Sequence, residues 1–171
     1  MKYLLLICLF MGTLTNAQFG LEAGYAFGNA KAEGKGINQK VSGNAFALGV
    51  VYDLQLSETL DLQPGISFGV GEKVDGKSNN SIGIGAGLHY YFNNREAGFY
   101  AGPVLSYGYS LADNKNMKKG ALGSGLVLGY DISEQFTIQT GYTLSLTDVS
   151  KIDGVKVSSN AFNISVQYFF R

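Results

Sequence analysis

Apolar side chains occupy every second position in eight separate stretches of this sequence, and no charged residue interrupts that apolar set. Successive side chains of a β-strand point to opposite faces of a sheet, so each stretch predicts a strand with one apolar face. Only Ser124 and Thr140 are polar members of the set. The eight predicted strands cover residues 19–27, 46–54, 60–70, 82–92, 99–111, 122–132, 136–146 and 162–170.

The opposite face of these strands decides between two all-β folds. Glycine is its commonest residue, and Ser, Thr, Ala, Asn and Gln supply many of the others. A soluble sandwich leaves its polar face in water, where lysine and glutamate would be expected. Small residues instead suit the crowded concave lumen of a small barrel. The pattern therefore predicts an eight-stranded antiparallel transmembrane up-and-down β-barrel.

The first residues of the chain predict export. Lys2 precedes an apolar stretch over residues 3–11, and Thr15-Asn16-Ala17 forms a small-residue cleavage site. We expect residues 1–17 to be a signal peptide and residues 18–171 to form one barrel domain. Cys8 lies within the predicted signal, so we expect no disulfide and no thiolate metal site in the mature chain. The formal net charge of zero argues against nucleic acid as a partner.

The predicted connections alternate between short and long. Short connections over residues 55–59, 93–97 and 133–135 alternate with long ones over residues 29–44, 71–80, 112–120 and 147–160. Short turns of such barrels face the periplasm and long loops face outward. An even number of strands then places both chain termini on the periplasmic side.

Aromatic residues of the apolar set avoid the middles of the predicted strands, as expected for two interfacial girdles. One group lies near the short connections or the chain ends, namely Phe19, Tyr52, Tyr90, Phe92, Phe99, Tyr130, Phe136, Tyr168 and Phe170. The other lies toward the long connections, namely Tyr25, Phe27, Phe46, Phe68, Tyr107, Tyr109, Tyr142 and Phe162. Pro64 and Pro103 interrupt two strands, and we expect a local bulge at each because proline has no N–H to donate.

These features resemble the eight-stranded outer-membrane β-barrel family of Gram-negative bacteria, which includes OmpA-type and OmpX-type barrels. The resemblance covers residues 19–171 and includes the closing segment from Val166 to Arg171. Members usually end in an aromatic residue that the barrel-assembly machinery reads, whereas here Phe170 is followed by Arg171. The resemblance implies an integral outer-membrane location, with membrane lipids and that machinery as partners. The family includes adhesion proteins, structural barrels, small channels and a few lipid-modifying enzymes.

The titratable residues on the lumen face include one candidate catalytic pair. His89 is the single histidine, and inward-facing Ser67 could pair with it as a nucleophile. Ser67 and His89 are expected at opposite ends of their strands, and one histidine makes no metal site. We therefore predict no enzyme activity, no metal and no cofactor.

Four carboxylates have inward parity: Glu22, Asp53, Asp61 and Asp131. Reflection about a turn centre at Ser57 places Asp53 directly opposite Asp61, where like charges repel. Arg171 continues the inward series of the last strand and could approach Glu22, so it is the expected counter-charge. A catalytic carboxylate pair is one interpretation. We favour a structural charge network in the lumen, which also includes His89.

Side-chain bulk divides the predicted lumen. Tyr91, Tyr100, His89 and Phe169 lie toward the short connections, whereas glycine and alanine predominate toward the long ones. The lumen is therefore predicted to be a cup, closed at one end. We expect a structural or surface-interaction role, in which the outward loops or the cup contact an extracellular ligand or surface partner. The alternatives are a narrow porin-like channel and, less favoured, a lipid-modifying enzyme.

Overall fold

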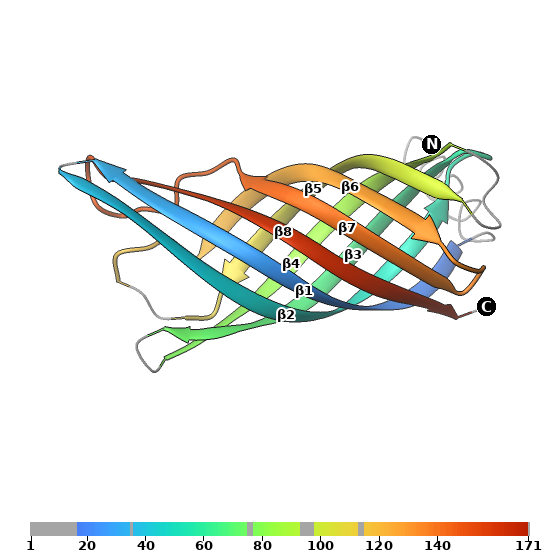
Figure 1. Cartoon of the computed structure of the whole chain (residues 1–171), viewed down its shortest axis with the longest axis horizontal. Helices are drawn as coiled ribbons and strands as arrows, with labels where there is room; N and C mark the ends of the chain where they lie inside the picture. The colour runs from blue at the N-terminus through green and yellow to red at the C-terminus, as the bar shows by residue number, and fades with distance from the viewer. Residues whose placement is uncertain (1–16, 35, 75–76, 93–97, 113–114, 171) are drawn as a thin grey trace, which may run out of the picture.

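The computed structural model describes residues 17–34, 36–74, 77–92, 98–112 and 115–170. They form eight antiparallel strands that close into a barrel, with β1 paired to β8 (Figure 1). No helix among these residues has the length and apolar character needed to cross a bilayer. The strands are β1 (Ala17–Gly34), β2 (Ile37–Gln55), β3 (Leu60–Val74), β4 (Lys77–Tyr91), β5 (Phe99–Ser110), β6 (Gly120–Asp131), β7 (Phe136–Ser145) and β8 (Lys156–Phe170). The predicted fold is confirmed.

The two faces of the barrel wall follow the predicted parity. No residue of the eight apolar runs is buried, and Leu126 is the most exposed of their large side chains at 67%. The buried strand residues have the opposite parity and face the lumen, as Tyr100 does with 1% exposure. An apolar exterior on a closed barrel is the arrangement that a lipid bilayer stabilises.

The two ends of the barrel differ in their connections. The short-turn end carries the turns over residues 56–59 and 132–135, the start of β1 and the end of β8 (right in Figure 1). The third predicted short connection, over residues 93–97, lies outside the described residues. The long-loop end carries the other four connections. Two of the predicted short turns are therefore confirmed to within about one residue.

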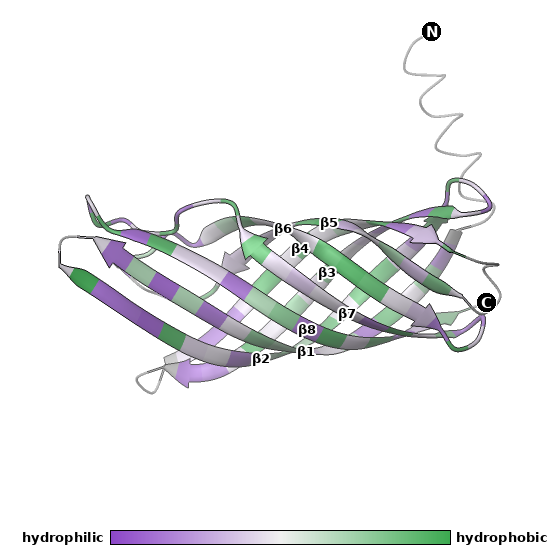
Figure 2. Cartoon of the chain, turned by 45° about the horizontal axis from the view of Figure 1, so that its top comes forward, coloured by the Kyte–Doolittle hydropathy of each residue, from purple (hydrophilic) through white to green (hydrophobic). Residues whose placement is uncertain are grey.

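Much of the predicted long-loop sequence is strand, which corrects the sequence interpretation. The ladder of β1 and β2 continues to Gly34↔Ile37, and β3 and β4 continue to Val74↔Lys77. β8 begins at Lys156. Beyond the lipid an outward side chain has no reason to be apolar, so the alternating pattern stops while backbone pairing continues. Hydrophilic colours accordingly dominate the projecting ends of β1 and β2 in Figure 2.

Exposed aromatic rings contact one another along the outer wall. At the short-turn end, Phe19 stacks on Phe170 with ring centroids 5.9 Å apart, and Phe99 meets Tyr130 at 4.6 Å. Toward the long-loop end, Phe27 lies 6.4 Å from Phe162. These contacts agree with two interfacial belts of rings.

The predicted proline bulges are wrong. Pro64 pairs with Ala86, and Pro103 pairs with Leu126, with no change of register at either position. Each proline instead lies beside a gap in the ladder on its other side, between β2 and β3 and between β4 and β5. A missing N–H removes a hydrogen bond from one neighbour only, so no extra residue is needed.

Candidate functional site

A pair of glutamines crosses the lumen. Gln63 on β3 donates from Nε2 to Oε1 of Gln167 on β8 at 3.3 Å, and Gln167 donates back from Nε2 to Oε1 of Gln63 at 2.9 Å. β1 and β2 separate their strands in the wall, so these hydrogen bonds span the interior. Both side chains are buried, Gln167 completely. The two reciprocal hydrogen bonds satisfy the side-chain amides, which would cost free energy if they were buried without partners.

A second chain of hydrogen bonds runs beside the first. The Tyr100 hydroxyl on β5 donates to Oε1 of Gln139 on β7 at 2.9 Å, and Gln139 Nε2 donates to Oε1 of Glu22 on β1 at 3.0 Å. Glu22 pairs with Gln167 in the β1–β8 register, so both chains lie at one level. We call Glu22, Gln63, Tyr100, Gln139 and Gln167 the plug layer.

The sequence identified only part of the plug layer. Glu22 was predicted as a lumen charge and Tyr100 as lumen bulk, whereas the three glutamines were missed. Their inward parity on a face otherwise made of small residues was the available signal. Which strands they connect could not be read from it, because that depends on how the closed barrel brings distant strands together.

His89 and Asp61 lie together against the plug layer. They are directly opposite in the β3–β4 register, and the His89 ring stacks on Tyr100 with centroids 4.4 Å apart. His89 is 3% exposed and Asp61 is fully buried. Ser67 is opposite Gly83, six positions along β4 from His89, which corresponds to roughly 20 Å of strand. The structure therefore does not bring Ser67 and His89 together as a dyad.

The predicted Asp53–Asp61 pairing is wrong. The β2–β3 register puts Gln55 opposite Asp61, and the same register puts Gln63 at the level of Asp53. The hairpin turn is centred one residue later than Ser57. A shift of one residue in the turn centre moves each cross-strand partner by two positions, which separates the two carboxylates along the ladder.

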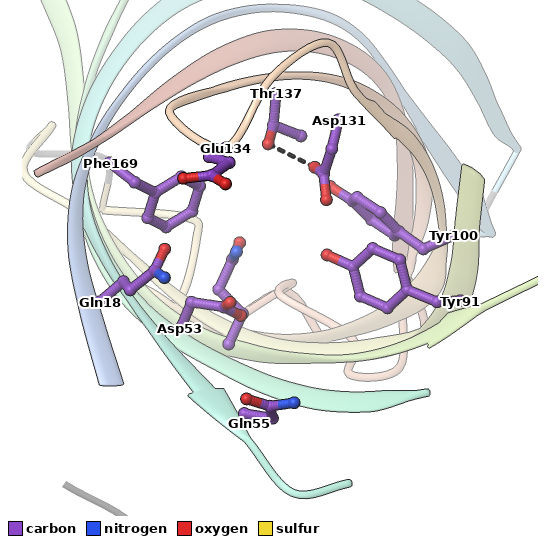
Figure 3. A pocket seen from close by; sticks show the side chains of 10 residues that line it. Gln18, Asp53, Gln55, Tyr91, Tyr100, Asp131, Glu134, Thr137 and Phe169 are labelled. Carbon is purple, nitrogen blue, oxygen red and sulfur yellow. Dashed lines mark hydrogen bonds between the residues drawn. The ribbon is translucent and has the colours of Figure 1, made fainter. Parts of the chain in front are cut away.

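A cavity of about 230 Å³ opens at the short-turn end (Figure 3). Asp53, Asp131 and Glu134 approach it from different sides, and the Thr137 hydroxyl donates to Oδ1 of Asp131 at 2.6 Å. Asp53 and Asp131 were predicted to face the lumen, whereas Glu134 was missed because it belongs to a turn. Arg171 lies outside the described residues, so its neutralising role stays a prediction.

The lumen widens on the other side of the plug layer. A middle cavity of about 250 Å³ is followed by one of about 770 Å³ at the long-loop end. Gly28, Gly43, Gly108 and Ser106 are among the small residues that line the larger cavity. Buried Tyr91, Tyr100 and Phe169 lie at the opposite end. The distribution of bulk agrees with the predicted cup.

Charge is segregated between the two ends. The described lysines all lie in the outer ends of strands or in the long connections, namely Lys31, Lys40, Lys73, Lys77, Lys115, Lys118, Lys119, Lys151 and Lys156. Four described carboxylates share that end, namely Glu33, Glu72, Asp148 and Asp153. Within the described ranges the short-turn end has carboxylates but neither lysine nor arginine. The long-loop end is therefore the cationic end.

Two long connections are joined above the barrel. Met117 and Ser150 form a β-bridge, and the Lys118 N–H donates to the carbonyl of Val149 at 2.7 Å. Oδ1 of Asp148 accepts the N–H groups of Ser150 and Val157, which lowers the pKa of Asp148 below its ordinary value of 3.8. The lysines of these connections thus belong to loops that hydrogen bonds hold in place.

In the part of the chain that the structure describes, no group of three His, Cys, Asp or Glu side chains is arranged to hold a metal ion.

A closed antiparallel barrel with an apolar outer wall that suits lipid defines an integral β-barrel membrane protein. The chain belongs to the family described as outer membrane protein beta-barrel domain, whose model matches residues 3–170. This family is found in the outer membrane, which confirms the predicted location.

Solved structures share the fold at low sequence identity. Neisserial surface protein A (NspA) is 20% identical with a TM-score of 0.57, covering 91% of this chain and 99% of its own. Ail, the attachment invasion locus protein of Yersinia pestis, is 16% identical with a TM-score of 0.54, covering 90% and 99%. Ail in complex with the heparin analogue sucrose octasulfate gives 15%, 0.52, 90% and 99%. A comparison with curated proteins finds no match.

Proposed function

We propose that this protein is a non-enzymatic outer-membrane barrel that acts at the cell surface through its long-loop end, with a lumen closed to solutes. The plug layer is the observation that carries the proposal. Its five side chains come from β1, β3, β5, β7 and β8 and hydrogen-bond across the interior. Opening a path would separate buried partners, and each buried polar group left unsatisfied costs about 1–3 kcal/mol.

The orientation in the membrane is part of this proposal. In barrels of this kind short turns face the periplasm and longer connections face outward. We infer that the cationic long-loop end faces the exterior and that both chain ends face the periplasm. Ail, which shares the fold, was crystallised with an anionic heparin analogue. The lysines of the long-loop end give this chain the charge to contact anionic surface partners.

Two alternative functions remain distinguishable. A narrow channel would need the plug layer to open, and its test is given at the end of the Discussion. A lipid-modifying enzyme would need a nucleophile and base in contact, and the separation of Ser67 from His89 disfavours that pair. Outer-membrane lipid analysis should show no species that depends on this protein. A lipid change that is lost in both Ser67→Ala and His89→Ala variants would instead identify an enzyme.

Cysteine labelling on whole cells tests the orientation. Lys118→Cys places a thiol at the long-loop end, and Glu58→Cys places one in a short turn. The sequence has a single cysteine, Cys8, which lies in the predicted signal peptide. A membrane-impermeant maleimide should label Lys118→Cys on intact cells and Glu58→Cys only after the outer membrane is opened. The reverse result would overturn the proposed surface role.

A further inference from the structure

Strand β2 projects further from the barrel than its neighbour β3. Its pairing with β1 is continuous out to Gly34↔Ile37, whereas its pairing with β3 begins only at Ala45↔Gly71. Among the described residues, the segment Ile37–Gly43 therefore has a strand on one side only. In Figure 1 the β1–β2 and β3–β4 hairpins diverge toward the long-loop end, which leaves this side of β2 open. We call Ile37–Gly43 the β2 edge.

The opposite side of the same projection is closed. β8 pairs with β1 out to Glu33↔Lys156, while its pairing with β7 stops at Leu144↔Asn160. Beyond that point two backbone N–H groups of β8 donate to side chains instead of to a neighbouring strand. The Val157 N–H donates to Oδ1 of Asp148 at 2.8 Å, and the Ser159 N–H donates to Oγ of Ser145 at 2.9 Å. No side chain in the described ranges caps the β2 edge in this way, so the sheet β2-β1-β8 has one closed and one open edge.

The open edge offers backbone groups at the spacing of a strand. Every second residue of β2 directs its N–H and C=O away from β1, because antiparallel pairing uses only alternate residues on each side. Proteins usually blunt such edges with lysine, proline, a bulge or a covering segment. The β2 edge has one lysine, Lys40, but it has no proline, and its register with β1 is unbroken. It also exposes two apolar side chains, Ile37 at 38% and Val41 at 59%. An extended polypeptide is the partner that matches this row of donors and acceptors.

Charge indicates what that polypeptide carries. Lys31 and Lys40 are directly opposite in the β1–β2 register, where like charges repel. Glu33, the one carboxylate on this part of β1, forms an ion pair with Lys31, and Lys156 stands opposite Glu33 on β8. The projection thus holds more lysine than carboxylate. A strand with carboxylates would relieve the repulsion at Lys40, whereas a second copy of β2 would add another lysine.

We propose that the β2 edge is a docking site to which an extended, acidic segment of another polypeptide adds as a further strand. The inference rests on the proposed function in one respect only, namely the orientation that places the β2 edge and its partner outside the cell. Strand addition itself requires neither a closed lumen nor a particular orientation. Its test in purified protein can therefore fail while the surface role survives, and the reverse is also true.

The probe is a synthetic peptide of about eight residues that alternates threonine and glutamate, a length matched to the β2 edge. The folded protein is held in lipid nanodiscs, and binding is followed by fluorescence anisotropy of the labelled peptide. Amide hydrogen exchange locates the site. About every second amide of Ile37–Gly43 should exchange roughly tenfold more slowly with the peptide bound. The same peptide with alternate amides N-methylated keeps its charge but loses its donors, and it should bind at least about tenfold more weakly.

A charge reversal provides the second arm. Lys40→Glu should weaken binding of the threonine–glutamate peptide by about fivefold and favour a threonine–lysine peptide. Lys151→Glu makes the same charge change at the same end of the barrel, away from the β2 edge, and should alter binding less. Equal binding of the N-methylated peptide, or equal effects of the two variants, would show attraction by charge alone and overturn the proposal. Slowed exchange at the β2 edge that depends on protein concentration without peptide would identify a second copy as the occupant and also overturn it.

Discussion

An arginine introduced on either side of the same strand should separate the lipid face from the lumen face. Leu105 on β5 points outward, is 53% exposed and lies between the ring-bearing positions Phe99 and Tyr107. Its neighbour Ser106 points inward and lines both the middle and the outer cavity. The two positions lie at nearly the same depth, so Leu105→Arg and Ser106→Arg differ chiefly in the face that receives the charge.

The expected cost follows from that difference. An arginine on the lipid face near the bilayer midplane destabilises a barrel by about 2–4 kcal/mol, which lowers the folding equilibrium constant by a factor of roughly 30 to 900. Ser106→Arg places the same charge among small residues beside cavities that can hold water, so its cost should be well below that of Leu105→Arg.

Urea unfolding in phospholipid vesicles measures both variants. Because the sequence has no tryptophan, the transition is followed by circular dichroism and by the shift in gel migration on heating. Wild type, Ser106→Arg and Leu105→Arg should unfold in that order of decreasing stability. If Ser106→Arg is the less stable of the two variants, the assignment of lipid and lumen faces is refuted.

Three further predictions concern local contacts. Gly102→Ala should lower the free energy of unfolding by about 3 kcal/mol or prevent folding, because the added Cβ would lie 1.6 Å from the carbonyl oxygen of Leu88 on β4. The Cβ of the control variant Gly108→Ala meets nothing within 4 Å, so this variant should unfold like wild type in the dichroism assay. Because the pKa of Asp148 is lowered in the folded protein, the stabilisation of the β7–β8 connection by this carboxylate is present above the unfolded pKa near 4 and is lost as pH falls through the lower folded pKa. The NMR signal of the Val157 amide should follow this loss, and the pH dependence should disappear in Asp148→Asn. Arg171→Ala should speed proteolysis at the end of β8 while Arg171→Lys behaves like wild type, and identical digestion of all three proteins would contradict a neutralising role.

The face assignments could be predicted because the lipid imposes a period-two pattern on each strand. The apolar runs record where the wall meets hydrocarbon, and every described run faces outward as expected. This pattern does not extend to the outer ends of the strands, so it cannot identify them. Residues 30–34 and 37–41 are paired strand in the structure but carry lysine, asparagine and glutamine in water, so periodicity could not distinguish them from loop.

The strand register and the contacts across the lumen could not be predicted from the sequence, for two different reasons. The opposition of Asp53 and Asp61 depended on the turn centre, and turn geometry fixes that centre without changing the alternating pattern. Gln63, Gln139 and Gln167 each have the expected inward parity. Their hydrogen bonds depend on the curvature of the closed barrel and on the tilt of its strands, which no local pattern records.

Planar-bilayer recording tests the closed lumen most directly. Purified wild-type protein should insert without producing steady ion-selective openings, because the plug layer spans the interior. The double variant Gln63→Ala/Gln167→Ala removes the reciprocal amide pair and, where it folds by dichroism and gel shift, should show conductance above wild type. Steady, ion-selective conductance from the wild type would contradict the account.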